Sequence, residues 1–218
     1  MTISTNEISA EKRRSQADRR SESDRRMMRA AARLIARNGV AGTSLAEVGV
    51  AAGYSRGLPV ERYGTKVGLV RALLAATETW FRDHLARTLA GKSGLEAIEL
   101  RVGAHLASVD RSDSATAALH AIYTASQSVM PELRKPVAAF TSRWCAGLVA
   151  DMRQGQQAGE IRKDIDCDAE ARFLLAAMRG LMMQYLMDGS HRDVAEAKAI
   201  LLAHCRDRLG TARPRRTR

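Results

Sequence analysis

The fold is decided by the stretch GVAGTSLAEVGVAAGYSRGLPVERYGTKVGLV at residues 39–70. Ser44 and Glu47 have the spacing of a capping box, in which each side chain accepts a hydrogen bond from the other residue's backbone N–H at the start of a helix. Gly53 supplies a tight turn, and Ser55 is placed to cap a second short helix. Two short helices joined by such a turn behind a longer helix form a helix-turn-helix. The predicted short helices run from the Ser44 cap to about residue 52 and over residues 56–62.

The segments on either side of this stretch are also predicted to be helical. Upstream, apolar residues recur at helical spacing and predict a helix over residues 22–38, which Gly39 ends. Residues 1–21 are charged, rich in Ser and poor in apolar side chains, so we expect a flexible arm there. Downstream, the same periodicity predicts six longer helices, at residues 66–90, 94–109, 115–128, 131–158, 168–187 and 191–209.

The composition favours an all-α fold of about nine helices. Hydrophobic residues make up 45% of the 218, which is enough for a packed core, and only three Phe and four Tyr are present. Strands favour aromatic and β-branched residues, whereas Ala, Leu, Arg, Met and Glu favour helices. The predicted division is a flexible basic arm at residues 1–21, a helix-turn-helix domain at 22–68, a larger C-terminal domain at 69–209 and a basic tail at 210–218.

The positive charge is concentrated at the two ends of the chain. Residues 1–71 hold 14 Lys and Arg against 7 Asp and Glu, residues 72–210 hold 17 of each sign, and residues 211–218 hold 4 Arg and no acid. These four are Arg213, Arg215, Arg216 and Arg218. A basic first third beside a neutral remainder indicates that the first part binds a polyanion.

The stretch at residues 39–70 resembles the TetR family of transcriptional repressors. The shared pattern consists of Gly39, Thr43-Ser44, Ala52-Gly53, Ser55, Tyr63 and Gly64-Thr65-Lys66. The resemblance implies a repressor whose C-terminal domain dimerises; it does not specify a ligand, because the C-terminal domains of this family diverge widely. Two positions depart from the pattern. Val60 stands where the family commonly has a Tyr that touches phosphate, and Pro59 predicts a distorted first turn, because it removes an intrahelical N–H bond.

The DNA-contacting side chains are expected at the starts of the short helices. Arg56 presents two donors either to guanine O6 and N7 or to a phosphate. Ser44 and Ser55 are caps whose hydroxyls also face phosphate oxygens. Glu61 either accepts from cytosine N4 or pairs with Arg62. The predicted set of DNA-contacting residues is Ser44, Ser55, Arg56, Gly57, Leu58, Glu61, Arg62, Tyr63 and Lys66.

The other four members of that set are expected to act through backbone approach, apolar contact or phosphate contact. Gly57 either lets the backbone approach DNA closely or is simply a residue that weakens the helix. Leu58 faces either the small core or a thymine methyl group. Tyr63 is a core residue with its hydroxyl near phosphate, and Lys66 clamps a phosphate. The expected partner of the whole module is a pseudo-palindromic double-stranded operator.

The neutral C-terminal part is expected to bind a small, mainly apolar molecule. Its Met and aromatic side chains are either ordinary core or the lining of a cavity between the longer helices. Polar side chains among them would orient the bound molecule. The predicted pocket residues are His105, His120, Tyr123, Gln127, Phe140, Trp144, Met178 and Met182.

A homodimer is expected from the segment FLLAAMRGLMMQYLM at residues 173–187. This helix is apolar almost all round, so it requires cover on both sides. With the last helix it would form a two-fold four-helix interface, which the family resemblance also implies. The predicted interface residues are Phe173, Leu181, Tyr185, Ala197, Ile200 and Leu201.

Other classes of protein fit the sequence less well. No phosphate loop, metalloprotease motif or nucleophile elbow is present, which argues against an enzyme, and no cofactor or metal is expected. The cysteines Cys145, Cys167 and Cys205 stand far apart and are expected to be reduced thiols in a cytoplasmic protein. The start of the sequence is polar and has no apolar run, so no signal peptide is expected there. A ligand-independent architectural DNA-binding protein stays open as the alternative, and weak sequence preference would distinguish it.

Overall fold

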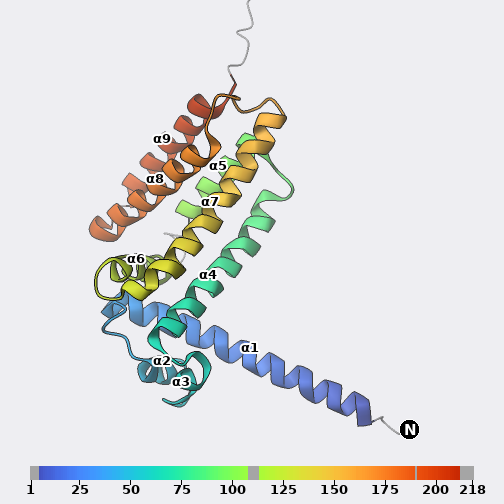
Figure 1. Ribbon diagram of the computed structural model, residues 1–218, viewed down its shortest axis with the longest axis vertical. Coiled ribbons are helices and arrows are strands. Elements are labelled where there is room, and N and C mark those ends of the chain that lie inside the picture. The colour runs from blue at the N-terminus through green and yellow to red at the C-terminus, as the bar shows by residue number, and fades with distance from the viewer. Residues whose placement is uncertain (1–4, 108–112, 190, 212–218) are drawn as a thin grey trace, which may run out of the picture.

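The computed structural model describes residues 5–107, 113–189 and 191–211, and within them the regular elements are helices (Figure 1). These are α1 (Thr5–Asn38), α2 (Leu45–Ala51), α3 (Leu58–Tyr63), α4 (Lys66–Leu89), α5 (Gly94–Leu106), α6 (Asp113–Gln127), η1 (Pro131–Leu133), α7 (Arg134–Gln157), α8 (Cys167–Asp188) and α9 (His191–Leu209). One isolated antiparallel bridge joins Ile161 and Gly210. The prediction of an all-α fold is confirmed. The four arginines of the predicted basic tail lie outside the described residues.

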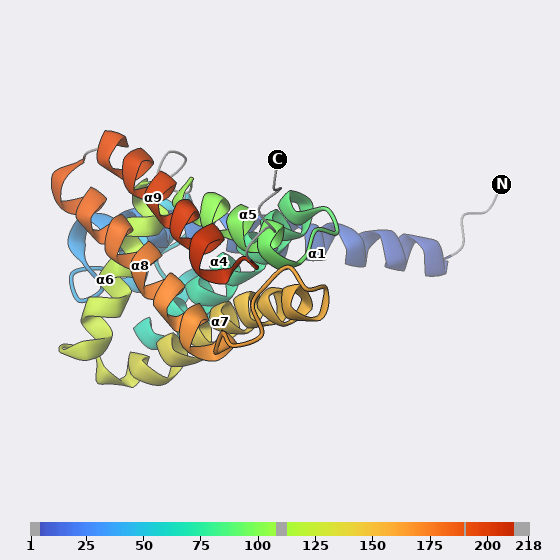
Figure 2. The same cartoon turned by 90° about the horizontal axis from the view of Figure 1, so that it is seen from above.

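The first helix begins much earlier than the sequence indicated. α1 starts at Thr5, not near residue 22, so the expected flexible arm is helical from Thr5 onward. Residues 5–21 contain no Gly or Pro and are rich in residues of high helix propensity. The prediction failed because it relied on an apolar stripe, which a helix surrounded by solvent does not need. Figures 1 and 2 both show this N-terminal half extending away from the other helices.

The third helix begins two residues later than predicted, and this removes the expected distortion at Pro59. Gly57 is the N-cap, and no side chain caps the helix, so the predicted cap at Ser55 is wrong. Pro59 occupies the second helical position, where an intrahelical N–H bond is not required. A Cβ on Gly49 of α2 would lie 2.4 Å from the Ser55 carbonyl oxygen and 3.1 Å from Pro59 Cδ. Only glycine therefore permits α2 to pack this closely on the turn.

The buried apolar side chains form two clusters. The first lies among α5, α7, α8 and α9 and includes the fully buried Leu148, Met152 and Met178. The second joins α1, α2 and α4 to α6, η1 and the first half of α7. Trp144 of α7 packs against both clusters.

The second cluster ties the helix-turn-helix to the rest of the chain. Ala118 and Ile122 of α6 are buried against the same group of side chains as Met27 and Ile35 of α1. The core of the N-terminal module therefore continues beyond residue 69, where the C-terminal domain was predicted to begin. A movement of α6 or α4 would consequently displace the helix-turn-helix.

Candidate nucleic-acid interface and C-terminal groove

The cap of α2 has the predicted geometry. The Ser44 hydroxyl accepts from the Glu47 backbone N–H at 3.2 Å, and the Ser44 backbone N–H donates to Glu47 Oε2 at 2.8 Å. The hydroxyl also donates to the same carboxylate at 2.7 Å, and these bonds lower the pKa of Glu47. Ser44 is exposed, so the capped end of α2 remains open to a phosphate.

The turn before α3 presents the exposed part of the module. Ser55, Arg56 and Gly57 are exposed, as is Glu61 within the helix, whereas Leu58 is half-buried in the module core. Arg56 stands ahead of the first turn of α3 and not on it, because the helix starts at Leu58. Among the described side chains no carboxylate pairs with Arg56. Its guanidinium is therefore available to a base edge or a phosphate.

Arg62 and Tyr63 are directed toward α1. Arg62 Nη1 lies 2.7 Å from Asp24 Oδ1, and its Nη2 donates to the Ser23 hydroxyl at 3.3 Å. The Tyr63 hydroxyl donates to the same Asp24 oxygen at 3.2 Å. Burial, followed by the negative charge of Asp24, raises the pKa of Tyr63 to about 12. Arg62 and Tyr63, both of which were predicted to contact DNA, therefore fix the orientation of α3 on α1.

Lys66 holds the start of α4 in place. Its Nζ donates to the Ala41 carbonyl oxygen at 2.6 Å, across the turn between α1 and α2. The Thr65 hydroxyl caps the same helix end by accepting from the Gly68 N–H at 3.1 Å. A phosphate contact by Lys66 would have to share the ammonium with this carbonyl.

The residues predicted to line a pocket separate into three groups. Phe140, Met178 and Met182 are buried core residues, and Gln127 is exposed at the end of α6. The remaining four are half-buried; they are His105, His120, Tyr123 and Trp144. Only Trp144 lines the groove described below.

Arg179 of α8, which the sequence analysis did not single out, lies beside three of these half-buried side chains. Its Nη2 donates to the Tyr123 hydroxyl at 3.3 Å and to Thr141 Oγ1 at 3.1 Å. The guanidinium carbon lies 4.6 Å from the centre of the Tyr123 ring, in a cation–π contact. The His120 ring nitrogen Nε2 lies 3.4 Å from the Arg179 carbonyl oxygen.

His105 packs among aromatic rings next to this arginine. Its ring centre lies 4.9 Å from that of Trp144 and 6.2 Å from that of Phe81, both in edge-on arrangements. Burial, and then the charges of Arg179 and His120, lower the pKa of His105 to about 3. The imidazole is therefore neutral at physiological pH.

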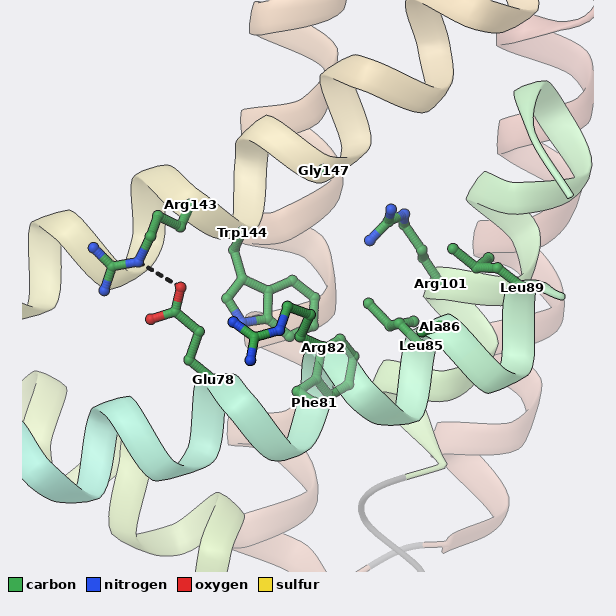
Figure 3. Close-up of a pocket in the computed structure, with 10 residues that line it drawn as sticks. All are labelled: Glu78, Phe81, Arg82, Leu85, Ala86, Leu89, Arg101, Arg143, Trp144 and Gly147. Atoms are coloured by element: carbon green, nitrogen blue, oxygen red, sulfur yellow. Dashed lines mark hydrogen bonds and ion pairs between the residues drawn. The ribbon is translucent and has the colours of Figure 1, made fainter. Parts of the chain in front are cut away.

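A half-open groove of about 350 Å³ lies between α4, α5 and α7 (Figure 3). It is lined by Glu78, Phe81, Arg82, Leu85, Ala86, Leu89, Arg101, Arg143, Trp144 and Gly147. The Phe81 and Trp144 rings lie 4.1 Å apart, centre to centre. The volume is within the range of small-molecule sites. The sequence analysis missed these residues except Trp144, because they come from three helices whose relative placement no local pattern specifies.

The predicted dimer residues divide between surface and core. Phe173 and Ile200 are 51% and 71% exposed, whereas Tyr185 and Leu201 are buried within the chain. Leu181 and Ala197 are half-buried. Two exposed methionines of α8, Met183 and Met187, were not predicted and lie on the same helix as Phe173. Figure 2 shows α8 and α9 side by side along one edge of the molecule.

The described part of the chain was predicted to bind no metal, and its side-chain clusters and helices bear on metal sites and membrane spans as follows. No group of three or more His, Cys, Asp or Glu side chains there is arranged to hold a metal ion. No described helix has the length and apolar character needed to cross a membrane. Cys145, Cys167 and Cys205 are free thiols, and burial raises the pKa of each.

Two family models match the chain in the order that the fold suggests. Residues 27–73 match the bacterial regulatory proteins of the tetR family, and residues 94–210 match the C-terminal domain of BetI-type transcriptional repressors. The chain belongs to the TetR family. Members of this family are DNA-binding transcriptional regulators. No curated protein sequence matches the chain.

Solved structures share the TetR fold over almost their whole length. A TetR regulator from Chloroflexus aurantiacus has a TM-score of 0.77 at 23% identity, covering 88% of this chain and 98% of its own. A protein from Saccharomonospora viridis in complex with choline has a TM-score of 0.75 at 22% identity, covering 88% and 100%. The regulator FadR from Bacillus subtilis in complex with stearoyl-CoA has a TM-score of 0.70 at 16% identity, covering 83% and 96%.

The contact between α1 and α3 predicts a specific effect of Asp24→Asn. Removing the carboxylate charge leaves the pKa of Tyr63 raised by burial alone, so we expect it to fall from about 12 toward the ordinary value of 10.0. Because the Arg62–Asp24 pair is partly exposed, the free energy of unfolding should fall by only about 1 kcal/mol. Tyrosine ring NMR against pH and urea unfolding measure the two effects. The exposed Asp18→Asn should change neither, and an unchanged Tyr63 pKa in Asp24→Asn would show that the hydroxyl does not depend on Asp24.

The neutral His105 predicts a pH dependence of stability. With its folded pKa near 3, this side chain takes up a proton near pH 6.5 only in the unfolded chain. The unfolded state then binds more protons, so stability falls as the pH drops from about 7 toward 3. His105→Gln should remove about 1 kcal/mol of the difference between urea unfolding at pH 7.5 and at pH 5.5. Identical pH dependence in the two proteins would show that its surroundings do not keep the His105 imidazole neutral.

Proposed function

We propose that this TetR-family regulator is a homodimeric repressor that binds a pseudo-palindromic operator and leaves it when a small, mainly apolar ligand occupies the C-terminal groove. The observation that carries the proposal is the path of α4. This helix runs without interruption from Lys66 to Leu89. Its first half contributes Leu69, Val70 and Leu73 to the module core, and its second half lines the groove.

That path gives a ligand a physical means of acting on DNA binding. A molecule between α4 and α7 contacts the far half of the helix whose near half is locked into the helix-turn-helix. Displacement of one end of a rigid helix displaces the other. Linkage requires that the ligand bind the DNA-free form more tightly, and a coupling of about 1 to 3 kcal/mol gives roughly five-fold to 150-fold weaker DNA binding.

The exposed apolar side chains of α8 and α9 support the dimer. Phe173, Met183, Met187 and Ile200 are large and open to solvent in the single chain. Packing α8 and α9 against the same helices of a second copy would cover them in a two-fold four-helix interface. Each dimer then offers two α3 helices, which suit two half-sites about 34 Å apart along one face of the duplex.

The relatives with bound molecules support ligand binding as such. One was solved with choline and another with stearoyl-CoA. The two compounds differ in charge and size, so the fold accommodates organic ligands of unlike chemistry. We infer that this chain also binds an organic molecule, whose class depends on its own side chains.

DNA recognition is tested by selecting bound sequences from random duplexes and then measuring affinities of variants. Arg56→Ala should relax the preference at one base pair per half-site, costing about 1 to 3 kcal/mol there. Lys66→Ala should lower the affinity for all DNA sequences about equally, and the salt dependence of binding should fall by roughly the amount due to one phosphate contact. Arg87→Ala, an exposed arginine near the far end of α4, serves as the control. If Arg56→Ala lowers the affinity for all sequences equally and leaves the sequence preference unchanged, Arg56 contacts a phosphate and not a base. If the wild type has no preferred DNA sequence, the proposal of a sequence-specific repressor is wrong.

A further inference from the structure

The groove between α4, α5 and α7 combines an apolar floor with arginines. Phe81 and Leu85 of α4 are almost fully buried beneath it, and Trp144 of α7 closes one side. Three arginines and a single carboxylate, Glu78, stand among its lining residues. A surface of this kind has affinity both for an apolar chain and for negative charge.

Arg101 is the arginine that the fold positions most firmly. Its side chain is 15% exposed, and its Nε forms an ion pair with Asp151, which is 9% exposed. Its guanidinium lies against α7 at Gly147, where a Cβ would come within 2.9 Å of Nη1. The absence of a side chain at Gly147 therefore creates the space that the guanidinium occupies.

The outer nitrogens of Arg101 retain hydrogen-bonding capacity. Only Nε is engaged by Asp151, and no described residue accepts a hydrogen bond from Nη1 or Nη2. In Figure 3 the side chain extends from α5 into the space between α4 and α7, and the drawn ion pair belongs to Glu78 and Arg143. A guanidinium held on one edge and open on the other is suited to a second carboxylate, which it binds through two parallel donors.

The remaining charges favour an anion over a cation. Arg82 and Arg143 stand at the mouth of the groove with side chains 68% and 55% exposed. Glu78 is already paired with Arg143 across the gap between α4 and α7. Deeper in the domain, the Tyr123 ring face that would suit a ligand cation is covered by Arg179. A quaternary ammonium ion in the groove would therefore meet three arginines and a carboxylate that is already paired with one of them.

We propose that the groove binds an amphipathic organic carboxylate, with the carboxylate on Arg101 and its apolar chain along Phe81, Leu85 and Trp144. This inference rests on the proposed function, because it names the class of ligand that the regulator senses. It also assigns a role to Gly147, which leaves room for the anchoring guanidinium.

The test compares three probes with the same ten-carbon chain: decanoate, decan-1-ol and the decyltrimethylammonium ion. Trp80→Phe leaves Trp144 as the only tryptophan, so its fluorescence reports occupancy of the groove. We expect saturable binding of decanoate, binding of decan-1-ol weaker by about ten-fold for want of the charge-assisted bonds, and no binding of the ammonium ion. Equal affinity for decanoate and decan-1-ol, or tighter binding of the ammonium ion, overturns the proposal.

Variants of Arg101 test the anchor itself. Arg101→Lys keeps a cation beside Asp151 but removes the planar pair of donors, and Arg101→Gln with Asp151→Asn removes both charges without leaving a buried carboxylate unpaired. Each variant should bind decanoate about ten-fold or more weakly than the wild type does, while its affinity for decan-1-ol should be unchanged. Arg87→Gln, outside the groove, is the matched control. If either folded variant, checked by circular dichroism, binds decanoate as the wild type does, Arg101 is not the anchor.

Operator binding, measured on the same proteins, separates this inference from the function on which it rests. If the wild type binds a selected operator but shows no preference for decanoate over decan-1-ol, the proposal of a carboxylate ligand is refuted and the proposed function is not. If the wild type binds decanoate but has no preferred DNA sequence, the proposed sequence-specific repressor is refuted and the proposed class of ligand is not.

Discussion

The structure depends on the continuity of α4. Its 24 residues span roughly 36 Å at 1.5 Å per residue, enough to reach from the helix-turn-helix to the part of the groove that Leu89 lines. Thr65 and Lys66 fix its first turn, and the buried side chains of Leu69, Val70, Leu73 and Leu74 anchor it in the module. Because the same rigid element belongs to the DNA module and to the groove, neither can move without consequences for the other.

A second connection limits how the module moves. α6 packs on α1 through Ile122 and its neighbours, and α1 holds α3 through Asp24. The orientation of the turn before α3 is therefore set by α1 and α4 together. α4 passes by the groove, whereas α6 ends beside the first turns of α7, so a ligand that separates α4 from α7 alters both connections (Figure 1).

The sequence was informative where structure is local. The capping box at Ser44, the turn at Gly53 and the approximate bounds of the longer helices follow from residues within a few positions of one another. It was uninformative where the partner is distant. Nothing near Arg62 indicates Asp24, 38 positions upstream, and nothing near Arg101 indicates Asp151, 50 positions downstream. The early start of α1 was missed for a different reason, since that helix is supported by propensity and not by burial.

In the proposed mechanism, occupancy of the groove changes the placement of the helix-turn-helix through α4. Spin labels at Ala51→Cys, an exposed position at the end of α2, would report the separation of the two modules in a dimer by pulsed electron spin resonance. Cys145 is replaced by Ser to remove the half-buried native thiol. The account predicts one distance distribution with operator bound and a different one with decanoate bound. A single unchanged distribution, at a decanoate concentration that demonstrably releases the operator, would contradict it.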